Sequence, residues 1–529
     1  MTMRERNAVW LGSLAVAFLI ALTIWLVYLP GNRTPETPSE SANGATLRVG
    51  LAGWGEINTL DPAKAATAAP VLVVWQVYDR LVRISNEGRL ETMLATQWTA
   101  NEAQTEWTFK IRKDAAFQGP QGQLGPVTVS DVRSSIERAI KIPSYGQSLL
   151  GDLLIGVPEF LSGEAERIEG IQIQEENITF RLTRPFAFLP ERLASSFFSV
   201  VPADTPPDTA SPPPGSGPYL IANWSPATQT VELSKAPHPY APHSEASPKT
   251  IIVRQFQSEG VAIEELRAGT LDWLEVTSTA LPVLRTIEAE RGIAIDLPSH
   301  TQIRLVALNQ EKFVFQSPVI AQALNLATNR QEIVNILGGG SVTPSPIPGD
   351  QNLDHQLQHD PEKARQLLTG IAPESLNLTM LVQPGEESKT IAELLRRDWE
   401  RVGFSISLKS GLADFFPRLV NGDYEMALAY YGPFMPTPEQ YLWPYLSTSQ
   451  PIPNAMRYSS EGFDEAYEQY VAAQTTTDQE KELDTALKIL VSNPPTVWIV
   501  KPPLVTATRG KLSAPRPTGT PDFYLLERF

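Results

Sequence analysis

The chain of 529 residues has no cysteine, only five histidines and few charged residues for its length (19%). Without cysteine it can form no disulfide, thiolate metal site or cysteine nucleophile, and no cysteine can accept a lipid. Acidic residues outnumber basic ones, which gives a formal net charge of -16, and no cluster of Lys and Arg is visible. Because binding of nucleic-acid phosphates draws on such clusters, nucleic acid is not an expected partner.

Two motifs that could carry chemistry are incomplete. His355 and His359 are four residues apart, a spacing that could place two imidazoles on one helical face for a metal. The glutamate of a zinc-protease motif is missing, however, and the pair directly precedes the helix-capping Asp360. Ser216 lies between two glycines but lacks the Gly-x-Ser-x-Gly frame of a hydrolase. No nucleophile, base and orienting group can be assembled, so we expect neither an enzyme nor a metal site, and no cofactor.

The N-terminus carries an uncharged apolar run of 22 residues, from Ala8 to Leu29. It is long enough to cross a hydrocarbon core of ~30 Å as a helix. Arg4 and Arg6 precede it, which puts the N-terminus in the cytoplasm and the body outside. A cleaved signal peptide is the alternative, although its apolar region is usually only about 7–15 residues long. We expect residues 1–30 to be a membrane anchor or signal sequence, and the Pro- and Ser-rich segment 31–46 to be a flexible tether.

The rest of the chain is apolar enough (42%) for a large core that divides into two or three domains. Strand-like and helix-like patterns alternate, as an α/β architecture requires. The segments 47–51, 107–111 and 178–182 each alternate apolar and polar or small residues, which predicts half-buried strands. No internal repeat is visible.

Three helix starts are predicted from capping residues. Thr128 and Asp131 form a capping box at the start of one helix. Pro318 stands at the first position of a second helix, for which Gly338 supplies a stop. The dipeptide that begins with Asp360 opens a third. These caps are structural and none is catalytic.

Five short motifs follow one another between Leu60 and Ile140. They are Leu60-Asp61-Pro62, Tyr78-Asp79-Arg80-Leu81-Val82, Leu94-Ala95-Thr96-Gln97-Trp98, Trp107 to Lys113, and Thr128-Val129-Ser130-Asp131-Val132. Further matches extend the series to about residue 512: Gly215-Ser216-Gly217-Pro218-Tyr219, Val306 to Asn309, Ala327 to Arg330, Asp360 to Leu368, Gly422 to Glu425, Pro436-Thr437-Pro438 and Pro494 to Trp498. In this order they resemble the peptide/nickel family of substrate-binding proteins, which deliver ligands to ABC importers.

The resemblance implies an α/β fold of the two-lobed, periplasmic-binding-protein-like type (class II), with an extra small inserted domain and the N-terminal transmembrane helix in front. Crossing strands would join the lobes and enclose the ligand between them. The implied domains are a discontinuous first lobe of residues 46–82, 187–262 and 495–529, an inserted domain of residues 83–186, and a second lobe of residues 263–494.

The resemblance also implies two ligand-facing segments. Counting forward from the Leu60 motif gives Ala66, Thr67 and Ala68, small residues that leave room for a ligand. The strand that ends at 431 contributes Tyr430, Tyr431 and Gly432, followed by Phe434. Packing of the two tyrosines into the core of a lobe is the alternative to a role in binding.

Phe434 marks a departure from the family pattern. Peptide-binding relatives usually hold the ligand's terminal amine with an Asp four residues before the last Pro of the Pro-Asp-Pro element. Here that count from Pro438 gives Phe434, which cannot pair with an ammonium group, and the neighbouring Pro433 lacks a backbone N–H for a peptide strand. Glu439 is the alternative partner for an amine. We therefore expect a ligand other than an ordinary free-amine peptide.

The function that the resemblance implies is capture of a peptide-like or other small organic solute and its delivery to the permease subunits of an ABC importer. The chain would act on the periplasmic side of the inner membrane, tethered by its N-terminal helix or released if that helix is cleaved. The alternative is a membrane-tethered scaffold or sensor that keeps the binding-protein fold but engages another protein.

Overall fold

The computed structural model describes residues 46–529, apart from 86–87, 120–121, 210, 238–239, 241–243, 245, 299–300, 353, 355, 434, 450, 511, 517–518 and 529. The expected anchor (1–30) and the expected tether (31–46), except for its last residue, lie outside the described residues. That last residue, Thr46, already begins the first strand. Among the described residues, no helix combines enough length with enough apolar character to span a bilayer.

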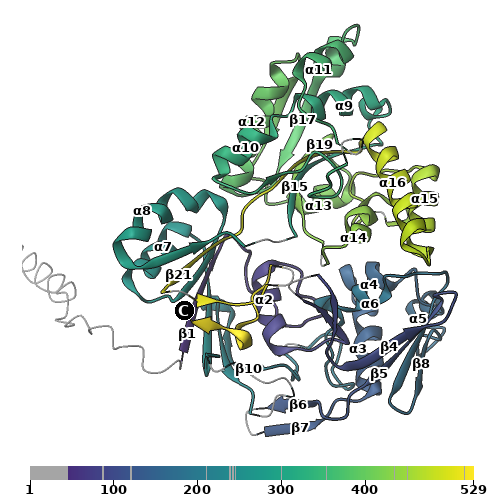
Figure 1. Cartoon of the computed structure of the whole chain (residues 1–529), viewed down its shortest axis with the longest axis vertical. Helices are drawn as coiled ribbons and strands as arrows, with labels where there is room; N and C mark the ends of the chain where they lie inside the picture. The colour runs from purple at the N-terminus through teal and green to yellow at the C-terminus, as the bar shows by residue number, and fades with distance from the viewer. Residues whose placement is uncertain are drawn as a thin grey trace, which may run out of the picture. The chain divides into compact units, whose positions relative to one another are not determined.

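One sheet of seven strands organises the first lobe (Figure 1). Its strands are, in spatial order, β10 (Tyr219–Ser225), β11 (Thr230–Lys235), β12 (Thr250–Phe256), β1 (Thr46–Ala52), β13 (Trp273–Val276), β21 (Val505–Arg509) and β14 (Ile293–Asp296). β1 lies inside the sheet, parallel to both β12 and β13. Leu47, Val49 and Leu51 are buried, which confirms the strand predicted from their spacing. The helices α7 (Glu259–Ala268) and α8 (Leu281–Arg291) accompany this sheet.

A second sheet of six strands organises the other lobe. Its strands are β16 (Ser341–Val342), β20 (Thr496–Lys501), β15 (Ile303–Leu308), β19 (Met426–Tyr431), β17 (Asn377–Val382) and β18 (Ser405–Lys409). The helices around it are α9 (Pro318–Ala327), α10 (Arg330–Leu337), α11 (Pro361–Leu367), α12 (Glu386–Glu400), α13 (Phe415–Asn421), α14 (Pro438–Leu442), α15 (Glu461–Ala472) and α16 (Thr476–Ser492). Figure 1 shows α15 and α16 running together, and the contacts confirm that they pack on each other.

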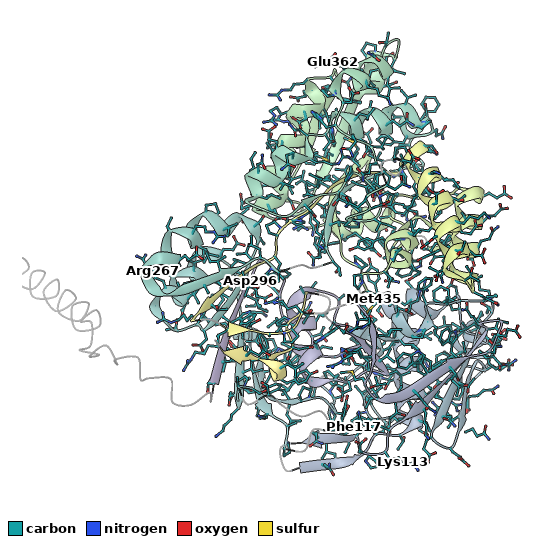
Figure 2. The ribbon with its side chains drawn as sticks, in the orientation of Figure 1. Lys113, Phe117, Arg267, Asp296, Glu362 and Met435 are labelled. Atoms are coloured by element: carbon teal, nitrogen blue, oxygen red, sulfur yellow. The ribbon has the colours of Figure 1, made fainter. Side chains whose placement is uncertain are left out.

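The inserted domain has its own antiparallel sheet of four strands, β4 (Ala95–Ala100), β5 (Glu106–Ile111), β9 (Asn177–Arg181) and β8 (Ile171–Gln174). Its helices are α3 (Val129–Lys141), α4 (Tyr145–Leu150) and α5 (Val157–Ser162). β6 (Ala116–Gly119) and β7 (Gly122–Pro126) form a hairpin that carries Phe117, labelled in Figure 2. Two further ribbons pair β2 (Val82–Ile84) with β3 (Leu90–Thr92), and β22 (Leu512–Ser513) with β23 (Glu527–Arg528). β5 and β9 confirm the strands predicted there.

The chain passes between the two large sheets at two places. Residues 297–302 lead from β14 to β15, and residues 502–504 lead from β20 to β21. Two sheets joined by short crossings, with a separate sheet inserted into the first part of the chain, match the expected two-lobed α/β fold.

The sheets divide the chain at other points than the expected domain limits. β13 and β14 belong to the seven-stranded sheet, whereas the sequence pattern begins the second lobe at residue 263. β20 belongs to the six-stranded sheet, whereas residues from 495 onward are expected in the first lobe. The reason is long-range pairing: Trp273 of β13 lies opposite Val49, and Thr496 of β20 lies opposite Ala307. Local alternation of residues does not reveal which sheet a short strand joins.

All three predicted helix starts are formed as expected, and α9 begins at Pro318 with this proline in its first turn. Thr128 and Asp131 make the reciprocal capping box at α3, with the Thr128 backbone N–H 2.8 Å from the Asp131 carboxylate. Asp360 caps α11 by accepting a bond from the backbone N–H of Lys363 (2.9 Å). Both caps satisfy backbone donors that the first turn of a helix leaves free.

The helix predicted from Pro318 to Gly338 is instead two helices. α9 ends at Ala327, and α10 begins with Asn329 as its cap. Gly338, with φ of 75°, ends the second helix in the left-handed conformation that favours glycine. The interruption arises because the Asn329 side chain accepts a bond from a backbone N–H of the next turn and so starts a new helix.

Candidate functional site

The Leu60-Asp61-Pro62 motif ties the first lobe to the inserted domain. Asp61 is buried, and its carboxylate accepts a bond from Nη1 of Arg138 in α3 (2.8 Å) and one from the backbone N–H of Ala63 (3.1 Å). Because a buried carboxylate is stable only when it is paired, this contact fixes the direction in which the chain leaves the motif. The motif is therefore structural, and it positions the residues that follow it.

The motif around Ser216 packs on the end of α2 (Ala68–Val77). The Ser216 hydroxyl donates to Asp79 (2.8 Å), and the backbone N–H of Gly217 donates to the Val77 carbonyl (2.9 Å). A Cβ atom at Gly215 would lie 2.0 Å from that same carbonyl oxygen, so only glycine allows the approach. Two motifs that are separate in the sequence thus hold α2 in place.

A cavity of about 460 Å³, called the main cavity below, opens where the start of α2 meets the end of β19. Six of the seven residues predicted to face a ligand line it: Ala66, Thr67, Ala68, Tyr430, Tyr431 and Gly432. Phe434 lies outside the described residues. Met435, labelled in Figure 2, also lines the cavity. The structure brings the two predicted segments together from opposite lobes; their contact with a ligand stays a prediction.

Two residues of the cavity wall carry hydrogen-bonding groups that are not used for helix capping or for a bond to another described residue, respectively. Thr67 is the N-cap residue of α2, yet its side chain makes no capping bond. The indole nitrogen of Trp54 is buried and finds no acceptor in the part of the chain that the structure describes. Since unpaired buried donors destabilise a protein, a ligand that accepts from Trp54 would bind with a gain.

The two tyrosines of β19 differ in their surroundings. Tyr430 is 38% exposed, and its ring lies 5.4 Å from the guanidinium carbon of Arg304. Tyr431 donates its hydroxyl to the carbonyl oxygen of Gln440 (2.7 Å), and burial raises the pKa of this tyrosine well above its usual value. Tyr430 therefore offers a free aromatic face, whereas Tyr431 is also part of the packing around α14.

Gly432 lets the end of β19 approach the crossing segment closely. A Cβ atom at this position would lie 2.7 Å from Cγ of Gln302. A larger side chain at this position would force the Gln302 side chain to move.

Glu275 is the one charged side chain among the described residues that line the main cavity. Its carboxylate is 2.6 Å from Nη2 of Arg516 and accepts a bond from the indole N–H of Trp273 (2.9 Å). The glutamate is thus neutralised by a buried partner. The described wall of the cavity is mostly apolar and aromatic, and it presents no unpaired charge to a ligand.

Several residues of the cavity were not predicted from the sequence. Trp54 had a usable signal, because it follows β1 directly, and ligands of α/β proteins bind beyond the carboxyl ends of strands. The others carry no such local signal and reach the cavity only through the packing of distant elements: Trp75, Tyr145, Glu275 and Phe416.

The histidine pair weighed as a metal site is only half described, because His355 lies outside the described residues. Within the described ranges, no group of three or more His, Asp or Glu side chains is arranged to hold a metal ion.

Comparison with known proteins identifies the family. Residues 89–452, more than half of the chain, match the model of the bacterial extracellular solute-binding proteins, family 5 (Middle). The chain is 25% identical to the probable D,D-dipeptide-binding periplasmic protein DdpA of Escherichia coli (strain K12), covering 83% of this chain and 86% of that protein. It is 22% identical to heme-binding protein A of Haemophilus influenzae, covering 79% and 80%.

Solved structures share the fold. The periplasmic binding protein DppA of Helicobacter pylori in complex with the peptide STSA has a TM-score of 0.76 at 19% identity, covering 92% of this chain and 98% of that one. The binding protein MoaA of A. tumefaciens R10 in complex with mannopinic acid has a TM-score of 0.74 at 21% identity, covering 92% and 99%. At these identities the likeness confirms the α/β class II binding-protein fold with its extra domain.

The motifs, the two sheets around a cavity and the family match agree, and the resemblance to the peptide/nickel class is confirmed. The chain belongs to the bacterial extracellular solute-binding proteins, family 5, and is an extracytoplasmic binding protein for peptides or similar solutes of ABC importers rather than an enzyme.

Proposed function

We propose that the chain captures a small organic solute in the main cavity and hands it to the permease subunits of an ABC importer. The observation that carries this proposal is the composition of the cavity wall, to which α2 of the first lobe and β19 of the second both contribute. A solute that contacts both lobes stabilises their closed arrangement. We expect the permease to recognise this closed form of the binding protein.

The proposed ligand has an apolar or aromatic face and no free amine. A buried ammonium group needs a paired carboxylate or several acceptors. Glu275 is already paired with Arg516, and the alternative carboxylate, Glu439, is fully buried in an ion pair with Arg192. Tyr430 supplies an aromatic face on which an apolar or sugar-like group can stack. The names of relatives mention a D,D-dipeptide, a peptide and mannopinic acid as ligands. We expect the ligand of this chain to be a small organic solute of similar size and polarity.

We further propose that the lobes follow the two large sheets. The first lobe would then contain residues 46–296 and 505–529, with the inserted domain at 83–186, and the second lobe residues 303–501. The two crossings at 297–302 and 502–504 would serve as the hinge, because a few residues between rigid elements absorb the change in backbone angles.

The proposed tether is the apolar run of the N-terminus. The chain has no cysteine to accept a lipid. An uncleaved helix of residues 1–30 would hold the binding protein on the periplasmic side of the inner membrane, close to its permease, with residues 31–45 as the connection to the folded body.

Capture by closure has a direct test. Native mass spectrometry of the purified protein identifies any co-purified solute. That solute should raise the melting temperature, with a stabilisation of about 2.7 kcal/mol at a hundredfold excess over its dissociation constant. It should also reduce the radius of gyration in solution scattering. A solute that stabilises the protein without compaction would argue against closure of the lobes.

A further inference from the structure

A second cavity, of about 220 Å³, shares the side chain of Trp75 with the main cavity. It is otherwise lined by residues between Asp79 and Met93, by Pro218 and Tyr240, and by the C-terminal segment around Asp522 and Tyr524. Four charged side chains line it in the described part of the chain: Asp79, Arg80, Arg83 and Asp522. The family motif Tyr78-Asp79-Arg80-Leu81-Val82 therefore supplies half of these charges, although the main cavity uses none of them.

Arg80 has two N–H-bearing nitrogen atoms for which the described residues provide no acceptor. Its side chain is 1% exposed, and its guanidinium carbon lies 3.8 Å from the ring centroid of Trp75. Nε and Nη1 are both buried, and no acceptor among the described residues reaches them. Burial lowers the pKa of this arginine, which shows how unfavourable its surroundings are for a bare cation.

The two carboxylates beside Arg80 are engaged elsewhere. Asp79 accepts a bond from the Ser216 hydroxyl (2.8 Å) and is also hydrogen-bonded to Tyr240. Asp522 accepts a bond from the indole N–H of Trp75 (2.9 Å). Both acids lower the cost of burying Arg80 through their charge, but neither provides an acceptor for its two free N–H groups.

The other arginine of the cavity has its partners. Arg83 is 2.9 Å from the carboxylate of Glu91, and it also donates to the hydroxyl of Tyr524. Arg80 is thus the single described cation of this cavity that lacks an acceptor, and its side chain lines a space large enough for several non-hydrogen atoms. Because Nε and Nη1 are covered in this arrangement, a ligand reaches them only when the side chain shifts.

We propose that Arg80 binds the carboxylate of a small organic acid in the second cavity. A carboxylate accepts N–H bonds with its full charge, so it satisfies Nε or Nη1 better than water does and neutralises the buried cation. The described wall of the main cavity offers no free cation, so an acidic group would find its partner here. Trp75 forms part of both walls, and an acid with an aromatic or apolar body can lie against it.

The negative charges of Asp79 and Asp522 oppose an added anion, and this gives the site a pH dependence. Burial raises the pKa of Asp522 to about 6 and raises the pKa of Asp79 as well. The charged and titratable groups that face Arg80 are Asp79, Asp522, Arg83, Tyr240 and Tyr524. As the pH falls through 6, Asp522 becomes neutral and the affinity for a carboxylate rises.

The test is an equilibrium titration of the full chain, purified in detergent, with sodium acetate at constant ionic strength. We expect one saturable acetate site per chain, with affinity that increases below about pH 6. Arg80→Gln should weaken binding by about tenfold or more, whereas Arg80→Lys retains part of it. Asp522→Asn should strengthen binding at about pH 8 and reduce the pH dependence, to which Asp79 still contributes. Arg83→Gln is the matched control, because it removes a cation of the same cavity that is already paired.

Phenylpropionate distinguishes the two sources of the carboxylate. If it competes with acetate and binds more tightly, the acid group belongs to a solute with an apolar body; if only acetate binds, the site takes a free small acid. The proposal is overturned if the wild type binds neither acid saturably, or if the wild type and Arg80→Gln bind equally well. If Arg80→Gln does not fold, the effects of pH and of Asp522→Asn decide.

This inference rests on the second cavity and is separable from the proposed function. The two proposals can fail separately. If a solute raises the melting temperature and compacts the protein but acetate and phenylpropionate do not bind, the proposed function is supported and only the role of Arg80 is excluded.

Discussion

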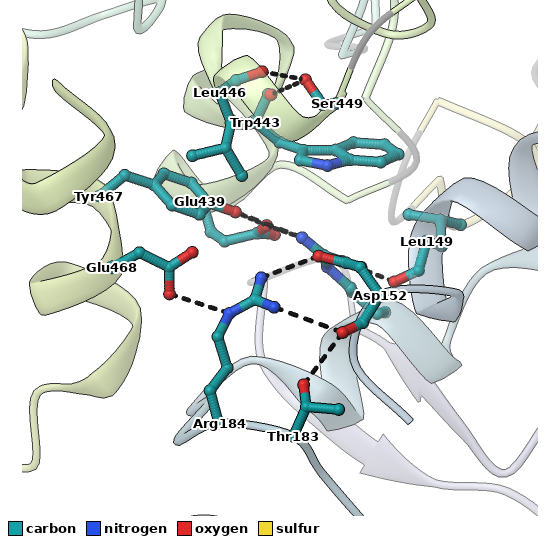
Figure 3. A network of polar contacts seen from close by, with 11 residues as sticks. Leu149, Asp152, Thr183, Arg184, Glu439, Trp443, Leu446, Ser449, Tyr467 and Glu468 are labelled. Carbon is teal, nitrogen blue, oxygen red and sulfur yellow. Dashed lines mark hydrogen bonds and ion pairs between the residues drawn. The ribbon is translucent and has the colours of Figure 1, made fainter. Parts of the chain in front are cut away.

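Arg192 and Glu439 form an ion pair that is completely buried between α6 (Leu189–Leu193) and α14. Nη2 of Arg192 is 2.6 Å from Oε1 of Glu439, and the two side chains are 1% and 0% exposed. Tyr467 donates its hydroxyl to the same carboxylate oxygen (2.6 Å), as Figure 3 shows. Arg192 also donates to the carbonyl oxygen of Leu149 (2.6 Å). The pair is therefore the centre of a polar network that joins α4 and α6 to the helices of the second lobe.

A second, more exposed pair of contacts extends this network. Arg184 is 2.9 Å from the carboxylate of Asp152 and 2.9 Å from that of Glu468 in α15 (Figure 3). Because the contact between Arg184 of the inserted domain and Glu468 crosses to the second lobe, opening of the lobes at this point requires charged groups to separate.

Loss of one partner of the buried pair should destabilise the protein strongly. Arg192→Met leaves Glu439 buried without its cation, and we expect a loss of about 3–5 kcal/mol in the free energy of unfolding by urea. The double variant Arg192→Met with Glu439→Leu should recover part of that loss, because no charge stays buried. Lys488→Gln, which breaks an exposed pair with Asp484, is the control and should change the unfolding free energy far less. Additive losses in the double variant would contradict this account.

The stability of the protein should fall as the pH rises from about 4.5 to 7. Burial, with the charge of Glu439 nearby, raises the pKa of Glu191 to about 7 from an ordinary value of 4.5. In this window the folded state binds more protons than the unfolded state, so the unfolding free energy decreases by at most about 1.4 kcal/mol per pH unit for this group. Asp522 acts in the same direction. Glu191→Gln should flatten the dependence of the melting temperature on pH; an unchanged slope would exclude Glu191 as its source.

The sequence predicted that the segment around Thr67 and the segment around Tyr430 lie close together. Thr67 and Tyr430 stand at element ends, the start of α2 and the end of β19, and motifs on either side fix where those elements begin and end. The register of β19 is in turn set by its pairing with β15, where Ile303 lies opposite Tyr431. Segments at element ends are therefore the part of a site that local motifs can locate.

Other features depend on contacts that no local pattern contains. Asp61 is recognisable as part of a motif, but its partner Arg138 lies 77 residues away. Glu275 belongs to a short apolar strand, and only the structure places it beside Arg516 at the cavity. The lack of acceptors for Nε and Nη1 of Arg80 could not be predicted from the sequence either, because it can be recognised only when the neighbouring residues are known.

The N-terminal segment should keep the protein on the inner membrane. Expressed in a diderm bacterium, the full chain should fractionate with the inner membrane and keep Met1 or Thr2 as its N-terminus, because the apolar run from Ala8 to Leu29 is long enough to span the bilayer. Replacement of two leucines of the run by arginine should abolish this retention. Recovery of a soluble mature form that starts near residues 42–45 would show instead that the segment is a cleaved signal.

The main cavity should discriminate against free-amine peptides. The sequence pattern predicts that Phe434 occupies the position at which peptide-binding relatives usually carry an Asp, and an ammonium group buried without a paired charge costs several kcal/mol. We expect unmodified di- and tripeptides to bind more weakly than the same peptides with a blocked N-terminus, measured by calorimetric titration. Phe434→Asp should reverse the order, because it restores an acidic partner for the amine.

Variants of Tyr430 and Tyr431 distinguish loss of ligand stacking from loss of protein stability. Tyr430→Ala should weaken the natural ligand, since it removes an exposed aromatic face, whereas Tyr430→Phe keeps the face and should bind nearly as well as the wild type. Tyr431→Ala should also weaken the ligand, but it lowers stability as well, because the Tyr431 hydroxyl is bonded to Gln440. If the wild type binds unmodified dipeptides at micromolar affinity, the alignment that places Phe434 opposite the amine is wrong. Glu439 could not rescue that alignment, because Arg192 and Tyr467 already hold its carboxylate in the protein interior.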